Sequence, residues 1–206
     1  MTPLGVRLSR HSGKRTAKAV TLTKMPDPAE EYLSVELQQR FRSQAKRVWI
    51  VTFAITFVWV FLIVAAPIFA ANSIDSFAKP IYSFFSYICH QKSERSFHIG
   101  DHAFAVCSRC FGVYFGILLG LVVYPLWRRI DEIEPLPRFW LFLSLVPIGI
   151  DWTLGVTGIW ENNHASRLIT GLILGFACAT YIIPAVVEIV RNLSKSDAFR
   201  RSKPNG

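Results

Sequence analysis

Long stretches of the sequence lack charge, and this absence limits the class of protein. No acidic or basic residue lies between Val48 and Ala71, a stretch of roughly 24 residues, whereas ~20 apolar residues suffice to cross a bilayer. Hydrophobic residues make up 51% of the chain, and they are concentrated in blocks of this kind. The chain has more apolar side chains than one soluble domain usually needs, so we predict an integral membrane protein.

Cysteine is also scarce, with four residues in a chain of 206. This number excludes a disulfide-dense secreted scaffold. Three of the four nevertheless lie between Cys89 and Cys110, in a polar segment that also holds three of the five histidines. Such a cluster favours a local metal or redox site.

The N-terminal region lacks the short apolar segment and small-residue cleavage site of a signal peptide. Residues 1–26 are basic and poor in large apolar side chains, so we expect a disordered cytoplasmic arm there. We expect an amphipathic helix over 27–47, since Leu33, Leu37 and Phe41 recur at fourfold spacing. The basic residues at the end of this helix predict contact with anionic lipid headgroups. A helix that simply leads into the first span is the alternative. We find no internal repeat or low-complexity segment.

The predicted fold class is an all-α polytopic membrane protein. Its membrane domain covers 48–190, and a cytoplasmic tail covers 191–206. Residues 77–88 are apolar but too few to span, and we expect an interfacial or re-entrant helix there, before the cysteine segment. Four longer apolar runs predict transmembrane helices at about 48–71, 111–127, 138–160 and 168–187.

Lysine and arginine are distributed unevenly around these spans. Ten precede the first span, three lie between Arg128 and Arg138, and five follow Val190. The opposite loops hold only Lys79, Lys92, Arg95 and the boundary residue Arg167. By the positive-inside rule both termini are cytoplasmic and the cysteine segment faces outward, which predicts a multi-pass protein of the cell membrane. Because orientation accounts for the basic residues, we expect no nucleic-acid partner.

Cys107 and Cys110 form a C-x-x-C motif, whose spacing lets two thiolates share one ion. Cys89 lies far enough upstream to belong to the second half of a tetrahedral site. The cofactor predicted is zinc or another transition metal. The fourth ligand is assigned to His90. Because neighbouring Cys and His side chains rarely bind the same ion, His98 and His102 are kept as alternatives.

Two other interpretations of the cluster stay open. Cys107 and Cys110 can form a disulfide that exchanges with Cys89, as in a membrane thiol–disulfide oxidoreductase coupled to quinone. Such enzymes generally use two pairs of cysteines, and this segment has three. In the other interpretation the cysteines are an inert staple, and the protein is a non-enzymatic scaffold.

Charged residues near the predicted spans suggest a polar pocket beside the cysteines, because an unpaired charge is costly in hydrocarbon. Asp151 lies within the third span, in its outer half, while Arg109 and Arg167 begin the second and fourth spans on the same side. A structural ion pair is one explanation. The other is catalysis on a lipid-derived or small substrate, with Asp151 and Arg109 as catalytic residues and Arg95, Arg167 and Tyr114 as substrate contacts.

Glycines recur at fourfold spacing in two of the predicted spans. Gly112, Gly116 and Gly120 share one helix face, and Gly171 and Gly175 share another. Small residues in this pattern let membrane helices approach closely. We expect these faces to pack against neighbouring helices, and a helix-mediated oligomer is compatible with the pattern.

Three motifs resemble the signature of the domain-of-unknown-function family 2085 of predicted integral membrane proteins. They are C-H-Q at Cys89, E-R-S-F at Glu94, and C-x-R-C-x-G-x-Y-x-G from Cys107 to Gly116. The resemblance covers roughly residues 81–190. It extends to further positions, namely Asp151, Arg167, Thr170 and Gly171. It implies a multi-span membrane protein with a Cys/His loop and carries no activity with it.

Overall fold

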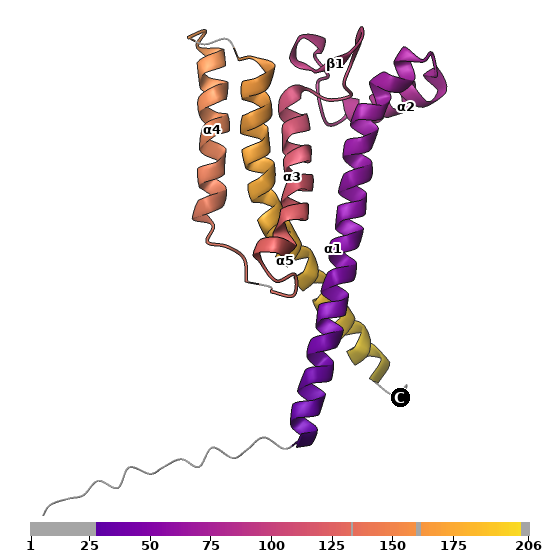
Figure 1. Cartoon of the computed structure of the whole chain (residues 1–206), viewed down its shortest axis with the longest axis vertical. Coiled ribbons are helices and arrows are strands. Elements are labelled where there is room, and N and C mark those ends of the chain that lie inside the picture. The colour runs from indigo at the N-terminus through magenta and orange to yellow at the C-terminus, as the bar shows by residue number, and fades with distance from the viewer. Residues whose placement is uncertain (1–27, 133, 160–161, 203–206) are drawn as a thin grey trace, which may run out of the picture.

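The computed structural model describes residues 28–132, 134–159 and 162–202. Within this part of the chain, five α-helices and a small β-hairpin follow one another (Figure 1). The arm expected over 1–26 lies outside the described residues. The elements are α1 (Pro28–Ala71), α2 (Asp75–Ser86), a 3-10 helix (Ser93–Arg95), β1 (His98–Ile99), β2 (His102–Ala103), α3 (Ser108–Trp127), α4 (Phe139–Val156) and α5 (His164–Ser202).

Four of the described helices, α1, α3, α4 and α5, are long and apolar enough to cross a membrane. Their candidate spans are Val35–Ala71, Ser108–Trp127, Phe139–Val156 and His164–Ser194. The remaining helix, α2, is short and precedes the cysteine segment, as expected. The predicted all-α polytopic membrane fold is therefore confirmed, while the side of the membrane on which the termini lie stays a prediction.

Helix α1 joins the predicted amphipathic segment to the first span without a break at residue 48. No glycine or proline lies between Pro28 and Pro67, so nothing in the sequence interrupts the helical backbone there. The indole Nε1 of Trp49 donates to the carbonyl oxygen of Leu121 at 2.9 Å. This bond ties the middle of α1 to α3.

The connections between helices gather at two opposite ends of the bundle. Figure 1 shows α2, the hairpin and the α4–α5 connection at one end, and the α3–α4 connection at the other. The N-terminal part of α1 and the C-terminal part of α5 extend past that second end. All the cysteine-segment residues therefore lie at the end opposite to the described ends of the chain.

Helices α3 and α5 form the most extensive helix pair, and glycine makes their close contact possible. A Cβ atom placed on Gly112 would lie 2.5 Å from the carbonyl oxygen of Leu168, and one on Gly175 would lie 2.0 Å from that of Val113. These distances are shorter than any ordinary carbon–oxygen contact. The predicted packing role of the glycines is confirmed, and the contact they serve lies within one chain.

A buried cluster fixes the cysteine segment onto α1. Its fully buried members include Ile63, Phe85 and Val106, which come from α1, α2 and the residues just before α3. The ring of Trp59 lies edge-on to Phe85, with centroids 5.3 Å apart. Burying large apolar and aromatic side chains from three segments holds the segment at a defined position above the spans.

We expect Gly175→Ala to lower stability by about 1–3 kcal/mol, the usual cost of forcing extra volume into a packed interface. Gly149→Ala is the matched control, because a Cβ at Gly149, also in a spanning helix, meets nothing within 4 Å. Thermal unfolding of the full chain in detergent gives the melting temperatures of the two variants. Equal melting temperatures for the two variants would contradict the close packing of α3 and α5.

Candidate functional site

The three cysteines of the cluster come from two points of the chain. Cys89 follows α2, with its backbone N–H donating to the carbonyl oxygen of Phe85 at 2.9 Å. Cys107 is the extended residue before α3, and Cys110 lies in the first turn of that helix. Their Sγ atoms all lie within 4.8 Å of one another. The start of α3 thus brings the C-x-x-C motif to Cys89.

Hydrogen bonds hold the backbone around Cys89 in place. Gln91 adopts a left-handed conformation with φ +46°. Its side-chain Nε2 donates to the carbonyl oxygens of Tyr82 at 2.7 Å and Ala105 at 2.9 Å. The Tyr82 hydroxyl in turn donates to the carbonyl oxygen of Ala103 in β2. Gln91 therefore links α2 to the residues that lead into α3, and this link sets the separation of the cysteines.

The surroundings of Cys89 favour a thiolate. Its side chain is buried, and the backbone N–H of Cys107 donates to its Sγ at 3.3 Å. Hydrogen bonds from the side chains of Cys107 and Cys110 lower the pKa of the Cys89 thiol to about 2, against the opposing effect of burial. Because the thiolate is the form that binds metal, the cluster offers at least one ready ligand.

The sulfur positions fit a tetrahedral ion. With Zn–S bonds of about 2.3 Å, two ligating sulfurs lie about 3.8 Å apart, so the observed spacing needs only a small contraction. Among the described residues, these three side chains are the only His, Cys, Asp or Glu group close enough to hold an ion. Three sulfurs leave one tetrahedral position for a fourth ligand.

The predicted histidine ligands differ in their placement. His90 is exposed and lines a cavity of about 330 Å³ that is also lined by all three cysteines. His98 lies in β1, where its Nε2 is 2.9 Å from the Ser93 hydroxyl, and His102 lies in β2. Neither of these two lines the cavity. His90 is therefore the one predicted histidine that shares a cavity with the sulfurs; its ring is not among the groups close enough to hold an ion with them, and its ligand role stays a prediction.

A second cavity, of about 670 Å³, adjoins the cysteines. We call it the arginine cavity, because Arg95, Arg109 and Arg167 reach it from the 3-10 helix, α3 and α5. Cys107 and Cys110 line it as well. The remaining lining residues are Glu94, Trp152, Gly155, Val156, Gly158 and Asn162. The structure thus brings three predicted arginines and two of the cysteines to one space.

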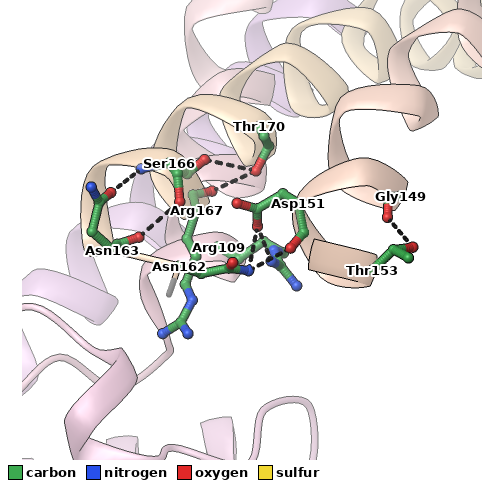
Figure 2. Close-up of polar contacts among 9 residues, drawn as sticks. All are labelled: Arg109, Gly149, Asp151, Thr153, Asn162, Asn163, Ser166, Arg167 and Thr170. Atoms are coloured by element: carbon green, nitrogen blue, oxygen red, sulfur yellow. Dashed lines mark hydrogen bonds and ion pairs between the residues drawn. The ribbon is translucent and has the colours of Figure 1, made fainter. Parts of the chain in front are cut away.

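Asp151 is paired with Arg109 and not with Arg167, the other arginine that begins a span on the same side. The Arg109 guanidinium donates to the Asp151 carboxylate, whose side chain is only 8% exposed. The Asn162 amide donates to the same carboxylate at 3.1 Å and to the Asp151 carbonyl oxygen at 2.6 Å (Figure 2). Figure 2 also shows the Arg167 guanidinium directed away from Asp151. The structural ion pair is present, and a catalytic role for its members stays a prediction.

Tyr114 lies apart from the arginine cavity. Its ring is edge-on to Trp59, with centroids 5.6 Å apart, and it packs against the buried cluster below Cys110. It lines neither the arginine cavity nor the cavity that contains His90. The structure therefore does not bring Tyr114 together with the other predicted substrate contacts.

Two further residues, Ser108 and His164, connect the parts of the site. The Ser108 hydroxyl is buried, donates to the Arg95 carbonyl oxygen at 2.9 Å, and lies 2.8 Å from His164 Nδ1. Since that hydroxyl hydrogen is already used, Nδ1 carries the proton of the His164 bond. The His164 ring also packs on Phe97 with centroids 5.5 Å apart. No local motif indicates this contact, because it joins residues far apart in sequence.

Comparison with known proteins agrees with this architecture. The model of the DUF2085 family, described as a predicted membrane protein, matches residues 89–181, which include the three cysteines and the Arg109–Asp151 pair. An uncharacterized protein of Methanocaldococcus jannaschii is 37% identical over 146 residues, which cover 68% of this chain and 92% of the relative. An uncharacterized protein of Methanothermobacter thermautotrophicus is 37% identical over 97 residues, or 46% of this chain and 84% of the relative.

No solved structure matches the chain significantly. The family match begins at Cys89, the first residue of the motifs from which the resemblance was inferred, and the archaeal relative is covered over nearly its whole length. The chain belongs to the DUF2085 family of predicted membrane proteins.

Proposed function

We propose that this protein binds one transition-metal ion, zinc in the first place, through Cys89, Cys107, Cys110 and His90. The observation that carries the proposal is the convergence of three Sγ atoms within 4.8 Å at one end of a membrane bundle. A thiolate-rich set of this kind suits zinc, which takes four ligands from Cys and His. His90 is chosen for the fourth position because it shares a cavity with the three sulfurs.

The site is proposed to face outward across the cell membrane. The basis is the positive-inside rule, since the basic segments belong to the end of the bundle away from the cysteines. At that surface the arginine cavity would receive a lipid-derived or other small substrate. Because Cys107 and Cys110 line the cavity, a bound metal would lie at its wall.

The chain's own residues have separable roles in this proposal. Arg95 and Arg167 hold the substrate, while the Arg109–Asp151 pair, supported by Asn162, fixes the wall formed by α3 and α4. A metal with an open position polarises a substrate oxygen or a bound water, whereas a fully ligated one is structural. Whether His90 binds the metal decides between these two uses.

Purified full-length protein should contain about one zinc per chain and four free thiols after denaturation. Serine at any of Cys89, Cys107 or Cys110 should remove most of the metal, because each supplies one of few ligands. Cys178→Ser is the matched control, since Cys178 lies in α5 outside the cluster. Elemental analysis and thiol counting before and after reduction measure both quantities.

The same preparation separates the alternatives. Metal-free protein with an oxidised Cys107–Cys110 pair would contradict the metal site and support a quinone-coupled thiol oxidoreductase. Metal-free protein with reduced thiols would support a scaffold with an inert loop.

His90→Ala should weaken zinc binding by about 100-fold or more, since even the loss of a residue that only supports a ligand costs 10–100-fold. His98→Ala and His102→Ala are matched controls from the same segment. Competition with a chromophoric chelator gives the three affinities. An unchanged affinity in His90→Ala, with zinc still bound, would remove His90 from the ligand set and leave a coordination position open.

Asp151→Ala should lower stability by about 1–3 kcal/mol, because it leaves the charge of the partly buried Arg109 without its partner. Replacing both residues, as Arg109→Leu with Asp151→Leu, should cost clearly less. Unfolding of the two variants in detergent tests this difference. A double variant that is less stable than Asp151→Ala alone would show that the two charges do not depend on each other.

A further inference from the structure

Two of the three arginines in the arginine cavity have no bonding partner among the described side chains. Arg109 is paired with Asp151, but within residues 28–132, 134–159 and 162–202 neither Arg95 nor Arg167 makes an ion pair or a side-chain hydrogen bond. Arg167 is half-buried in α5 and points away from Asp151 (Figure 2). Like charges that converge on one cavity repel, and an anion bound between them relieves this repulsion.

The ends of two helices add to the positive potential of this cavity. Arg109 lies in the first turn of α3 and Arg167 in the first turn of α5. Both helices therefore direct their N-termini, with the positive end of the helix dipole, to the side where the arginines lie. Backbone N–H groups and guanidinium groups together are typical of sites that bind phosphate.

An apolar cavity of about 630 Å³ continues along the same pair of helices. Its walls come mainly from α4 and α5, with Leu143, Pro147, Ile173 and Phe176 among them, and are completed by Trp127 and Leu136. Trp152, which lines the arginine cavity, follows Pro147 by about 7.5 Å along the axis of α4, at 1.5 Å per residue. The cationic and the apolar cavity therefore both border α4 and α5 at successive heights along these helices, and they share no lining residue.

We infer that these two cavities bind a lipid with a phosphate headgroup. The phosphate lies between Arg95 and Arg167 in the arginine cavity, and one hydrocarbon chain lies in the apolar cavity between α4 and α5. This inference rests on the polar pocket of the proposed function and does not depend on the metal.

The charges of the arginine cavity favour an anionic headgroup such as phosphate. Arg95, Arg109 and Arg167 supply three positive charges, and Asp151 offsets one of them. Glu94 also lines the cavity and offsets a second one; Glu94 and Arg95 are both exposed, so water screens the charge of each. Arginine binds phosphate oxygens through two parallel N–H bonds, which makes a terminal phosphate a suitable ligand for two guanidinium groups.

The test is native mass spectrometry of the full chain in detergent, titrated with dioleoyl phosphatidic acid. One lipid per chain should bind at saturation, and dioleoylglycerol, which lacks the phosphate, should bind at least about tenfold more weakly. Arg167→Gln and Arg95→Gln should each weaken binding by about tenfold, as expected for loss of a charged hydrogen bond. Arg138→Gln is the matched control, since Arg138 is exposed at the start of α4, at the other end of that helix.

A second pair of variants tests the apolar cavity. Ala177→Phe should fill it and weaken binding of dioleoyl phosphatidic acid, while leaving binding of the dihexanoyl form unchanged. Ala54→Phe, on the exposed face of α1, adds the same bulk elsewhere and should change neither.

Three results would overturn the inference. They are equal binding of dioleoylglycerol, equal affinities in Arg167→Gln, Arg95→Gln and Arg138→Gln, and inorganic phosphate binding as tightly as the lipid, which would indicate a site for a free anion. Zinc content is measured on the same samples. Lipid binding without zinc would leave this inference intact and contradict only the metal site, whereas zinc without lipid binding would do the reverse.

Discussion

The close approach of α3 and α5 is the contact on which the rest of the structure depends. Glycines on both helices let their backbones meet where any larger side chain would clash. Because both helices begin at the same end of the bundle, this contact places their first turns side by side. Cys107, Cys110 and Arg109 at the start of α3 thereby come next to His164 and Arg167 at the start of α5. Helix packing beside the candidate site thus sets its geometry.

Charge within a membrane-spanning segment imposes a second constraint. A carboxylate such as Asp151 has a large cost in hydrocarbon unless a partner compensates it. Arg109 supplies the opposite charge and Asn162 supplies additional hydrogen bonds. The pair connects α3 to α4, and Asn162 connects the chain just before α5 to the same point. The need to compensate the Asp151 charge within the bilayer therefore links α3, α4 and the start of α5.

Much of the fold could be predicted because a membrane-spanning helix requires a long apolar run without charges, which is visible in the sequence. An uncharged run of sufficient length has few alternatives to a spanning helix, so the four candidate spans follow from composition and length. The proximity of Cys107 and Cys110 likewise follows from their spacing. Their approach to Cys89, and the resemblance of all three to one family signature, were also expected from the sequence.

Other features depend on contacts that no local pattern encodes. The two-residue strands of the hairpin are too short to show alternation, although Gly100, with φ +58°, marks its turn. The choice of Arg109 over Arg167 as the partner of Asp151 depends on how the helices are rotated about their axes. The Ser108–His164 contact depends on the register between α3 and α5. Spacing along the chain cannot determine rotation or register.

The loose attachment of α4 has a consequence for access. Only Ser144 and Asp151 among its residues are buried, and its helix contacts are mainly with α5. The ion pair at Asp151 holds one end of α4, so an outward tilt of the other end, which begins at Phe139, would widen the apolar cavity. That cavity would then open sideways into the bilayer, and a hydrophobic molecule could reach it by lateral diffusion without crossing water.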